Sequence, residues 1–407
     1  MSPETAPLWR GRTLALLGIL LVAFNLRTAV ASLSPILGLI EADMSVPTAL
    51  VGLLGMLPPL CYAVFGIATP VLTRRAGLEP VLVGALIALV VGSAGRGLAG
   101  SGWWLFAAST VTFAAVGVGN VLLPPLVKRY FPDRIGLVTS LYVTALSVST
   151  FVPPLVAVPV SEAAGWRTSF EVWAAVALAS IVPWMALLLH PRRAAPAALP
   201  EEAEPGLLRH AFRSPLAWAL AAVFSVAGFN AYAVFAWLPS MLADTAGTSA
   251  AAAGVLLALY AAMGLPVSLV VPVLATRPAT VRVMVAIAAA TIAAGWTGLL
   301  VAPAAATWLW VALAGIGPLL FPLSLVLVNL RTRTHAGAVA LSGFMQSVGY
   351  VIVALGPIAV GLLHEATGTW AVPMALLLAT AVPALAAGLV VSRARFLEDE
   401  RAAVRGR

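Results

Sequence analysis

The clearest candidate for chemistry is a single arginine in the middle of the first long apolar run. The run extends from about Leu14 to Ile40 and contains Asn25-Leu26-Arg27. An arginine at membrane depth costs roughly 2.5–3.5 kcal/mol on insertion scales, so it faces a protein interior, a watery cavity or a bound anion. Its guanidinium offers five donors in a rigid fork and stays charged, which suits a cyanate- or carboxylate-like anion. We therefore predict that Arg27 is the substrate-binding cation of a central cavity.

The structural alternative is that Arg27 pairs with an acid or with helix carbonyl groups. The acidic residues near the predicted spans lie in loops or at span ends, namely Glu41, Asp43, Glu79, Glu162, Glu171, Asp244 and Glu365. This distribution favours the substrate role. Proton-driven carriers commonly use a carboxylate inside the membrane. The lack of a carboxylate in the middle of the predicted spans therefore predicts uniport, anion exchange or movement of a proton with the substrate. A role for Glu171 in coupling would overturn this hypothesis.

Composition places these residues in a membrane protein. The chain is 61% hydrophobic and only 9% charged, against about 25% charged residues in a soluble domain, and its mean hydropathy is +1.03. The net charge of +8 does not indicate nucleic-acid binding, because Lys and Arg occupy alternate loops as the positive-inside rule requires. We therefore predict a multi-pass protein of the bacterial inner membrane, in contact with the lipid bilayer, with both termini cytoplasmic.

Apolar runs of about twenty residues, the length that crosses a bilayer, recur along the whole chain. They predict an all-α protein of twelve transmembrane helices, arranged as an N-terminal half 1–190, a cytoplasmic linker 191–214, a C-terminal half 215–392 and a cytoplasmic tail 393–407. The predicted spans are Leu14–Leu37, Thr48–Leu72, Pro80–Leu98, Trp103–Val127, Gly136–Val160, one ending near His190, Pro215–Leu238, Ala250–Leu274, Val281–Val301, Thr307–Leu330, Val339–Leu363 and Ala371–Val391.

The two halves resemble each other at a shift of about 205 residues. Asn25 and Asn230 each follow a phenylalanine in the first span of their half. The other matches are Gly117-Val118-Gly119 with Gly315-Ile316-Gly317, Pro153-Pro154 with Gly356-Pro357, and Gly165-Trp166 with Thr369-Trp370. Paired helical halves are typical of transporters with a site near the midplane.

Other polar residues inside the spans could complete that site or simply join helices. The candidates for substrate binding, besides Arg27, are Asn25, Asn120, Tyr142, Asn230, Tyr232, Gln346 and Tyr350. Tyr232 occupies the position equivalent to Arg27 in the second half. Six tryptophans at span ends, Trp103, Trp104, Trp237, Trp308, Trp310 and Trp370, are interpreted as membrane-interface anchors. We identify no nucleotide loop, metal cluster or catalytic set, so we expect neither an enzyme nor a bound cofactor.

The whole chain resembles the major facilitator superfamily. That superfamily's loop motif survives between the second and third spans as Thr73-Arg74-Arg75-Ala76-Gly77, with Arg74 where an aspartate is expected. Within it, the chain is most similar to the cyanate and 2-nitroimidazole transporter family. The residues that carry this similarity are Asn25-Leu26-Arg27-Thr28-Ala29 with Ser34-Pro35, Gly117-Val118-Gly119-Asn120-Val121-Leu122-Leu123-Pro124 with Lys128, and Trp237-Leu238-Pro239. The resemblance implies a monomeric carrier of a small, often anionic, solute that works by alternating access.

Two rival functions follow from the same sequence. A proton-coupled multidrug or metabolite exporter of the same fold would need a large aromatic and methionine-lined cavity and a proton-binding acid, and only the aromatics are partly present. A membrane enzyme or sensor would need a catalytic cluster or a large soluble domain, and we identify neither.

Overall fold

The computed structural model describes residues 12–189, 209–275, 278–393 and 395–400. Most of the predicted linker, up to residue 208, lies outside these residues, as do residues 394 and 401–407 of the predicted tail. The chain divides into two compact units. Unit 1 consists of Met1–Val46 and Cys61–Pro200, and unit 2 consists of Pro47–Leu60 and Glu201–Arg407.

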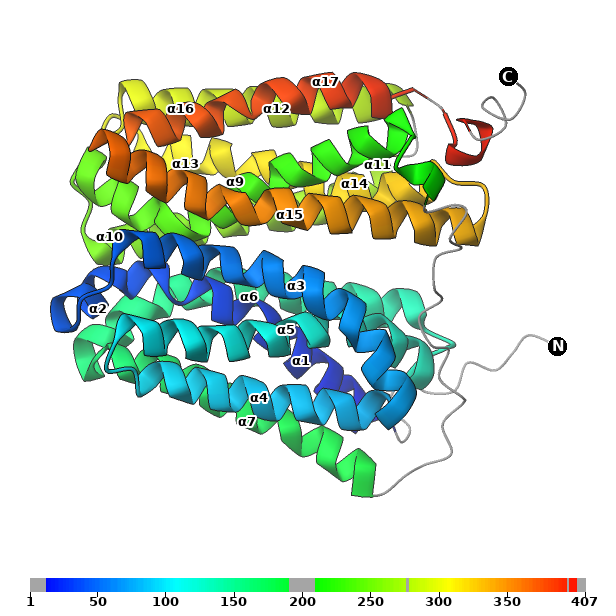
Figure 1. Cartoon of the computed structure of the whole chain (residues 1–407), viewed down its shortest axis with the longest axis horizontal. Coiled ribbons are helices and arrows are strands. Elements are labelled where there is room, and N and C mark those ends of the chain that lie inside the picture. Colours follow the sequence, from blue (N-terminus) through cyan, green and yellow to red (C-terminus); the bar gives the residue numbers. More distant parts are fainter. Residues whose placement is uncertain (1–11, 190–208, 276–277, 394, 401–407) are drawn as a thin grey trace. The chain divides into compact units, whose positions relative to one another are not determined.

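Helices make up both units, and within each unit they run alongside one another (Figure 1). The first half of the chain forms α1 (Thr13–Ala31), a 3-10 turn η1 (Ser34–Ile36), α2 (Leu37–Asp43), α3 (Thr48–Ala76), α4 (Leu78–Gly97), α5 (Gly102–Tyr130), α6 (Ile135–Ala164) and α7 (Trp166–Leu189). The second half forms α9 (Pro215–Ala246), α10 (Ala250–Ala262), α11 (Gly264–Leu274), α12 (Pro278–Val301), α13 (Thr307–Ile316), the 3-10 turn η2 (Gly317–Leu319), α14 (Leu320–Leu330), α15 (His335–Thr367), α16 (Ala371–Ala379) and α17 (Ala381–Val391).

Twelve helical segments among the described residues are long and apolar enough to cross a membrane, which confirms the predicted number of spans. Four of these spans are interrupted, at η1, between α10 and α11, at η2, and between α16 and α17. Pro35 and Pro318 lie in the two 3-10 turns, and a proline cannot donate the backbone hydrogen bond that would continue the helix. By contrast, the pairs Pro124-Pro125 and Pro153-Pro154 lie within continuous helices.

In unit 1, α1 is the central helix and packs against α5, α6 and α7. Close approach to α5 depends on Gly119, because a Cβ atom there would lie 2.7 Å from Cδ2 of Leu26. At one end of the unit, Arg12 pairs with Asp133 in the loop before α6. Nearby, Glu79 on α4 forms an ion pair with Arg129 at 3.0 Å and accepts a hydrogen bond of 2.8 Å from the Tyr130 hydroxyl, both on α5.

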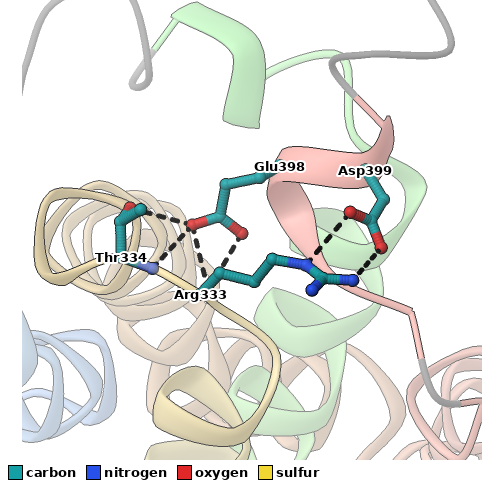
Figure 2. Close-up of polar contacts among 4 residues, drawn as sticks. All are labelled: Arg333, Thr334, Glu398 and Asp399. Carbon is teal, nitrogen blue, oxygen red and sulfur yellow. Dashed lines mark hydrogen bonds and ion pairs between the residues drawn. The ribbon is translucent and has the colours of Figure 1, made fainter.

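In unit 2, α9 packs closely along α15. The residues after α17 return to this pair and form a clasp on the loop between α14 and α15. Figure 2 shows the Glu398 carboxylate accepting hydrogen bonds from the backbone N–H groups of Arg333 and Thr334 and from the Thr334 hydroxyl, while Asp399 binds the Arg333 guanidinium through two bonds of 3.1 and 3.0 Å. Leu397, directly before Glu398, is fully buried, and its backbone N–H donates to the Arg331 carbonyl at 3.0 Å.

Candidate functional site

Arg27 lies on α1 within an apolar span that extends from Thr13 to Asp43. It is half-buried, whereas the flanking residues Leu26 and Thr28 are buried. Because successive residues of a helix are about 100° apart, Arg27 points roughly away from Asn25, which is 1% exposed. Arg27 therefore lies on a different face of α1 from Asn25.

A hydrogen bond to α7 holds the opposite face of α1. The Asn25 amide donates to the Ser180 hydroxyl at 2.7 Å and to the Leu21 carbonyl at 2.8 Å. Unit 2 repeats this arrangement on α9, where the Asn230 amide donates to the Thr380 hydroxyl at 2.8 Å and to the Val226 carbonyl at 3.0 Å. The sequence repeat is therefore also a repeat of contacts.

Asn230 is an acceptor as well as a donor. Its side-chain oxygen accepts a hydrogen bond of 2.9 Å from Nε1 of Trp296, which is 1% exposed. Both asparagines thus join helices, as our alternative interpretation allowed, and their role in binding solute stays a prediction.

The remaining unit 1 candidates lie on helices that touch α1. Asn120 on α5 directly follows Gly119, which contacts Leu26, so Asn120 and Arg27 lie at the same level of the unit. The Asn120 amide donates to the Val116 carbonyl of its own helix at 3.2 Å, and the residue is half-buried. Tyr142, on α6, is also half-buried.

The unit 2 candidates lie on the closely packed pair α9 and α15. Tyr232 is 9% exposed. Gln346 donates to the Ser342 hydroxyl at 2.8 Å. The Tyr350 ring meets Phe224 edge to face at a centroid distance of 5.0 Å. The structure thus places Tyr232 on α9 and both Gln346 and Tyr350 on the neighbouring helix α15.

Two buried arginines were not expected as interior residues. Arg96 is 1% exposed, donates to the Ala29 carbonyl and the Ser109 hydroxyl at 2.9 Å each, and lies 4.6 Å from the Phe113 ring. Arg331 is 6% exposed and donates twice to the Val391 carbonyl. Both carbonyls belong to the last turns of helices, where the backbone carries unpaired acceptors and partial negative charge. These two arginines are therefore helix caps.

The tryptophan interpretation needs a correction at two positions. Trp103, Trp104 and Trp308 are more than half exposed, as interface anchors should be, but Trp237 and Trp370 are only 3% and 4% exposed. Their indole N–H groups donate to the Pro357 carbonyl (2.8 Å) and to Asp244 (2.7 Å). A position at a span end predicts a tryptophan in contact with the membrane interface. Trp237 and Trp370 are instead buried, because each donates a hydrogen bond to a residue of another helix.

The family model of the Major Facilitator Superfamily matches residues 19–354 of the chain. The chain belongs to the major facilitator superfamily. The 2-nitroimidazole transporter of Escherichia coli is 32% identical over 92% of this chain and 94% of its own length. The cyanate transport protein CynX of the same organism is 25% identical over 87% of this chain and 91% of its own length. The chain is therefore a transporter of the same family as these two proteins.

A solved structure agrees with the fold. A bacterial homologue of the human lysosomal transporter Spinster is similar with a TM-score of 0.74, covering 97% of this chain and 99% of its own, at 19% sequence identity. The superfamily member is thus a multi-pass protein of the bacterial inner membrane with a small-molecule substrate, and the resemblance inferred from Arg27 and its neighbours is confirmed at the level of the family.

Proposed function

We propose that this transporter carries a small anionic or polar solute, similar to cyanate or a nitroimidazole, and that Arg27 binds the solute during alternating access. The observation that supports this is the position of Arg27, which is half-buried at the centre of an apolar span on a face turned away from the packed Asn25. A cation there has a high free energy unless something polar or anionic reaches it. The relatives named as transporters of 2-nitroimidazole and cyanate fit a small solute that offers nitrogen and oxygen acceptor atoms.

The two other buried arginines differ from Arg27 in their position along the helices. Arg96 and Arg331 each bind carbonyl groups at helix ends, so their charge serves the scaffold. Arg27 lies at neither helix end. Affinity would then come from charge attraction, and transport from a change in the side from which the solute is reached. Asn120 and Tyr142 from unit 1 and Tyr232, Gln346 and Tyr350 from unit 2 are proposed to add hydrogen bonds or ring contacts.

A thermal-shift experiment tests the proposal on purified full-length protein. The probes are cyanate, 2-nitroimidazole, benzoate and a neutral imidazole, each applied to the wild type, Arg27→Ala, Arg27→Lys and Arg393→Ala. Arg393 is exposed, so the last variant removes the same charge without touching α1. Ligand binding to the folded state raises stability by about 2.7 kcal/mol at a hundredfold excess over Kd.

We expect an anionic probe to stabilise the wild type and Arg393→Ala, to stabilise Arg27→Lys weakly, and to leave Arg27→Ala unchanged. Lysine keeps the charge but loses the bidentate fork. Equal stabilisation of the wild type and Arg27→Ala would reject the anion site. A large aromatic cation, applied as a fifth probe, tests the multidrug exporter, because stabilisation by that cation and not by the anions would favour that function.

A further inference from the structure

The Arg96 guanidinium uses only two of its three nitrogen atoms to hold the end of α1. Nη1 donates to the Ala29 carbonyl of α1 and Nε donates to the Ser109 hydroxyl of α5. The third nitrogen, Nη2, is buried and has no hydrogen-bond partner among the described residues. The rings of Phe113 and Phe170 lie 4.6 and 5.7 Å from the guanidinium carbon, and the residue is 1% exposed. Aromatic rings, and not bulk water, therefore flank the cation.

The charge of Arg96 has no carboxylate to neutralise it in the part of the chain that the structure describes. Glu171 on α7 is the acidic side chain beside this helix end, because a Cβ atom on Gly97 would lie 3.7 Å from its Oε1. Glu171 is exposed, however, and forms no ion pair with Arg96. The end of α1 offers only partial negative charge. Arg96 is thus a buried cation that is only partly compensated.

Two further donors without a partner lie one helical turn from residues that Arg96 contacts. Trp173 follows Phe170 by three residues on α7, and Ser32 follows Ala29 by three residues at the end of α1. The two side chains are 7% and 1% exposed, and neither the indole Nε1 nor the hydroxyl has a hydrogen-bond partner among the described residues. Residues three apart lie on the same face of a helix. Both unpartnered groups therefore belong to the faces that meet around Arg96.

The chemistry of these groups specifies what is missing. Guanidinium and indole N–H groups only donate hydrogen bonds, and a hydroxyl donates one. The absent partner is therefore an acceptor. A water molecule would accept some of these bonds but would leave the charge of Arg96 uncompensated, whereas an anion satisfies the donors and the charge together.

We propose that unit 1 binds a small monovalent anion, of the size and charge of chloride, through Nη2 of Arg96, Nε1 of Trp173 and the Ser32 hydroxyl. A spherical ion accepts hydrogen bonds from several directions, which suits donors that come from separate helices. The ion would join α1, α4 and α7 as a resident part of the scaffold. Ala29 lies two residues beyond Arg27, about 200° around α1, so the bound ion and the solute proposed for Arg27 would approach different faces of the helix.

Thermal unfolding of the purified full-length protein in detergent tests the proposal, with chloride as the probe. Chloride replaces gluconate, which is too large for the site, at constant ionic strength from a chloride-free buffer to about 300 mM chloride. We expect the melting temperature of the wild type to rise by about 3 °C, as mass action gives for a site that is half-filled at about 30 mM.

Two variants remove donors of the site. Arg96→Gln should abolish the chloride-dependent rise, because it removes the charge and Nη2. Trp173→Phe keeps a buried aromatic ring without the N–H group, and should raise the chloride concentration needed for half of the effect about tenfold, as for the loss of one hydrogen bond to an ion.

Each variant has a matched control with a buried side chain of the same type. Arg331→Gln removes the cap of unit 2, where Nε and Nη2 both donate to the Val391 carbonyl. Trp184→Phe removes another buried indole of α7 whose Nε1 has no partner among the described residues. Trp184 packs against Tyr130 at the other end of unit 1. Both controls should keep the full chloride-dependent rise, even where their melting temperature without chloride is lower.

Arg27→Ala separates this site from the proposed solute site and should keep the rise. A chloride effect that is lost in Arg27→Ala and retained in Arg96→Gln would assign the ion to Arg27, which overturns the Arg96 proposal and supports the other. The Arg96 proposal is also overturned if the wild type shows no rise, or if Trp173→Phe and Trp184→Phe respond to chloride alike. If Arg96→Gln does not fold, this comparison of the two tryptophan variants decides the question alone.

Discussion

Unit 1 and unit 2 hold their first helices with the same bond but place different side chains two residues further along. Asn25 binds Ser180 and Asn230 binds Thr380 through the same amide nitrogen, at 2.7 and 2.8 Å. The following positions are Arg27 in one unit and Tyr232 in the other. The comparison teaches that the duplicated scaffold does not depend on the charge of Arg27, because the bond that holds the helix is retained in unit 2, where the charge is absent.

The substitution with the largest expected effect disrupts the packing of α9 against α15 in unit 2. Gly228 lies two residues before Asn230, and a Cβ atom there would overlap Val353 on α15. Gly228→Ala should therefore destabilise the protein by about 1–3 kcal/mol, measured as a loss of melting temperature.

Two further variants sharpen this prediction. Val353→Ala in the Gly228→Ala background should restore much of the loss, because it removes the overlapping methyl groups. Gly343→Ala on α15 should have little effect, since its Cβ would meet open space. Equal losses for Gly228→Ala and Gly343→Ala would contradict the packing argument.

The next largest effect distinguishes the contributions of Asn230 and Asn25 to the stability of the protein. Asn230→Ala removes the acceptor of the buried Trp296 N–H as well as the bond to Thr380, and an unsatisfied buried donor costs about 1–3 kcal/mol. Asn25→Ala removes the bonds to Ser180 and Leu21, so we expect a smaller loss of about 0.6 kcal/mol, typical of interhelical bonds in membranes. Trp296→Phe should reduce the cost of Asn230→Ala, and the melting temperatures of these variants provide the measurement.

Two substitutions with smaller expected effects test whether the corresponding bonds of the two units contribute equally to stability. Ser180→Ala and Thr380→Val each remove one hydroxyl that accepts from an asparagine. Because the two bonds have nearly equal lengths, both variants should lose about 0.6 kcal/mol. A loss confined to one variant would show that the two bonds, although alike in geometry, carry different weight.

The smallest expected effects concern the loops before α6 and α15. Hydrogen bonding to Arg12 lowers the pKa of Asp133. Burial raises the pKa of Glu398, but hydrogen bonds from its own backbone N–H, from Arg333 and from Thr334 outweigh burial and lower it. A carboxylate with a lowered pKa contributes stability above its unfolded pKa and loses that contribution as the pH falls through the folded value.

Asp133→Asn and Glu398→Gln should therefore speed hydrogen exchange at the starts of α6 and α15 at neutral pH. The difference from the wild type should shrink below about pH 4, as the pH falls from the ordinary carboxyl range towards the lowered native pKa values and the native carboxylates take up protons. The exposed variant Glu365→Gln provides the control. Faster exchange in Glu365→Gln at the same two helix starts would show that the effect is not local.

The sequence predicts the spans and the repeat well, because both depend on the order of apolar residues along the chain. Twelve apolar runs and a recurring Asn25 and Asn230 are visible without coordinates. The role of Arg96 was not predicted. It stands near a glycine-rich turn at the end of a span, and its partners Ala29, Ser109 and Phe113 come from two other helices.

The sequence analysis missed two hydrogen bonds from tryptophan indoles to aspartates, those of Trp166 to Asp43 and of Trp370 to Asp244, for a related reason. A tryptophan at a span end has the same local sequence whether it faces lipid or an aspartate from another helix, and the acceptor Asp244 is 126 residues from Trp370. The clasp at the tail could not be predicted from apolar periodicity, because it consists of polar contacts. Glu398 binds backbone N–H groups of a loop, and Asp399 binds the Arg333 guanidinium. Long-range polar contacts of this kind leave no pattern in a single sequence.

The interrupted spans are unevenly distributed between the two halves of the chain. Three of the four breaks among the described residues lie in the second half of the chain, at α10–α11, η2 and α16–α17, and one lies in the first, at η1. Each break removes backbone hydrogen bonds that would resist bending. The second half therefore has more points at which a span is broken, whereas the helix that carries Arg27 is unbroken up to Ala31.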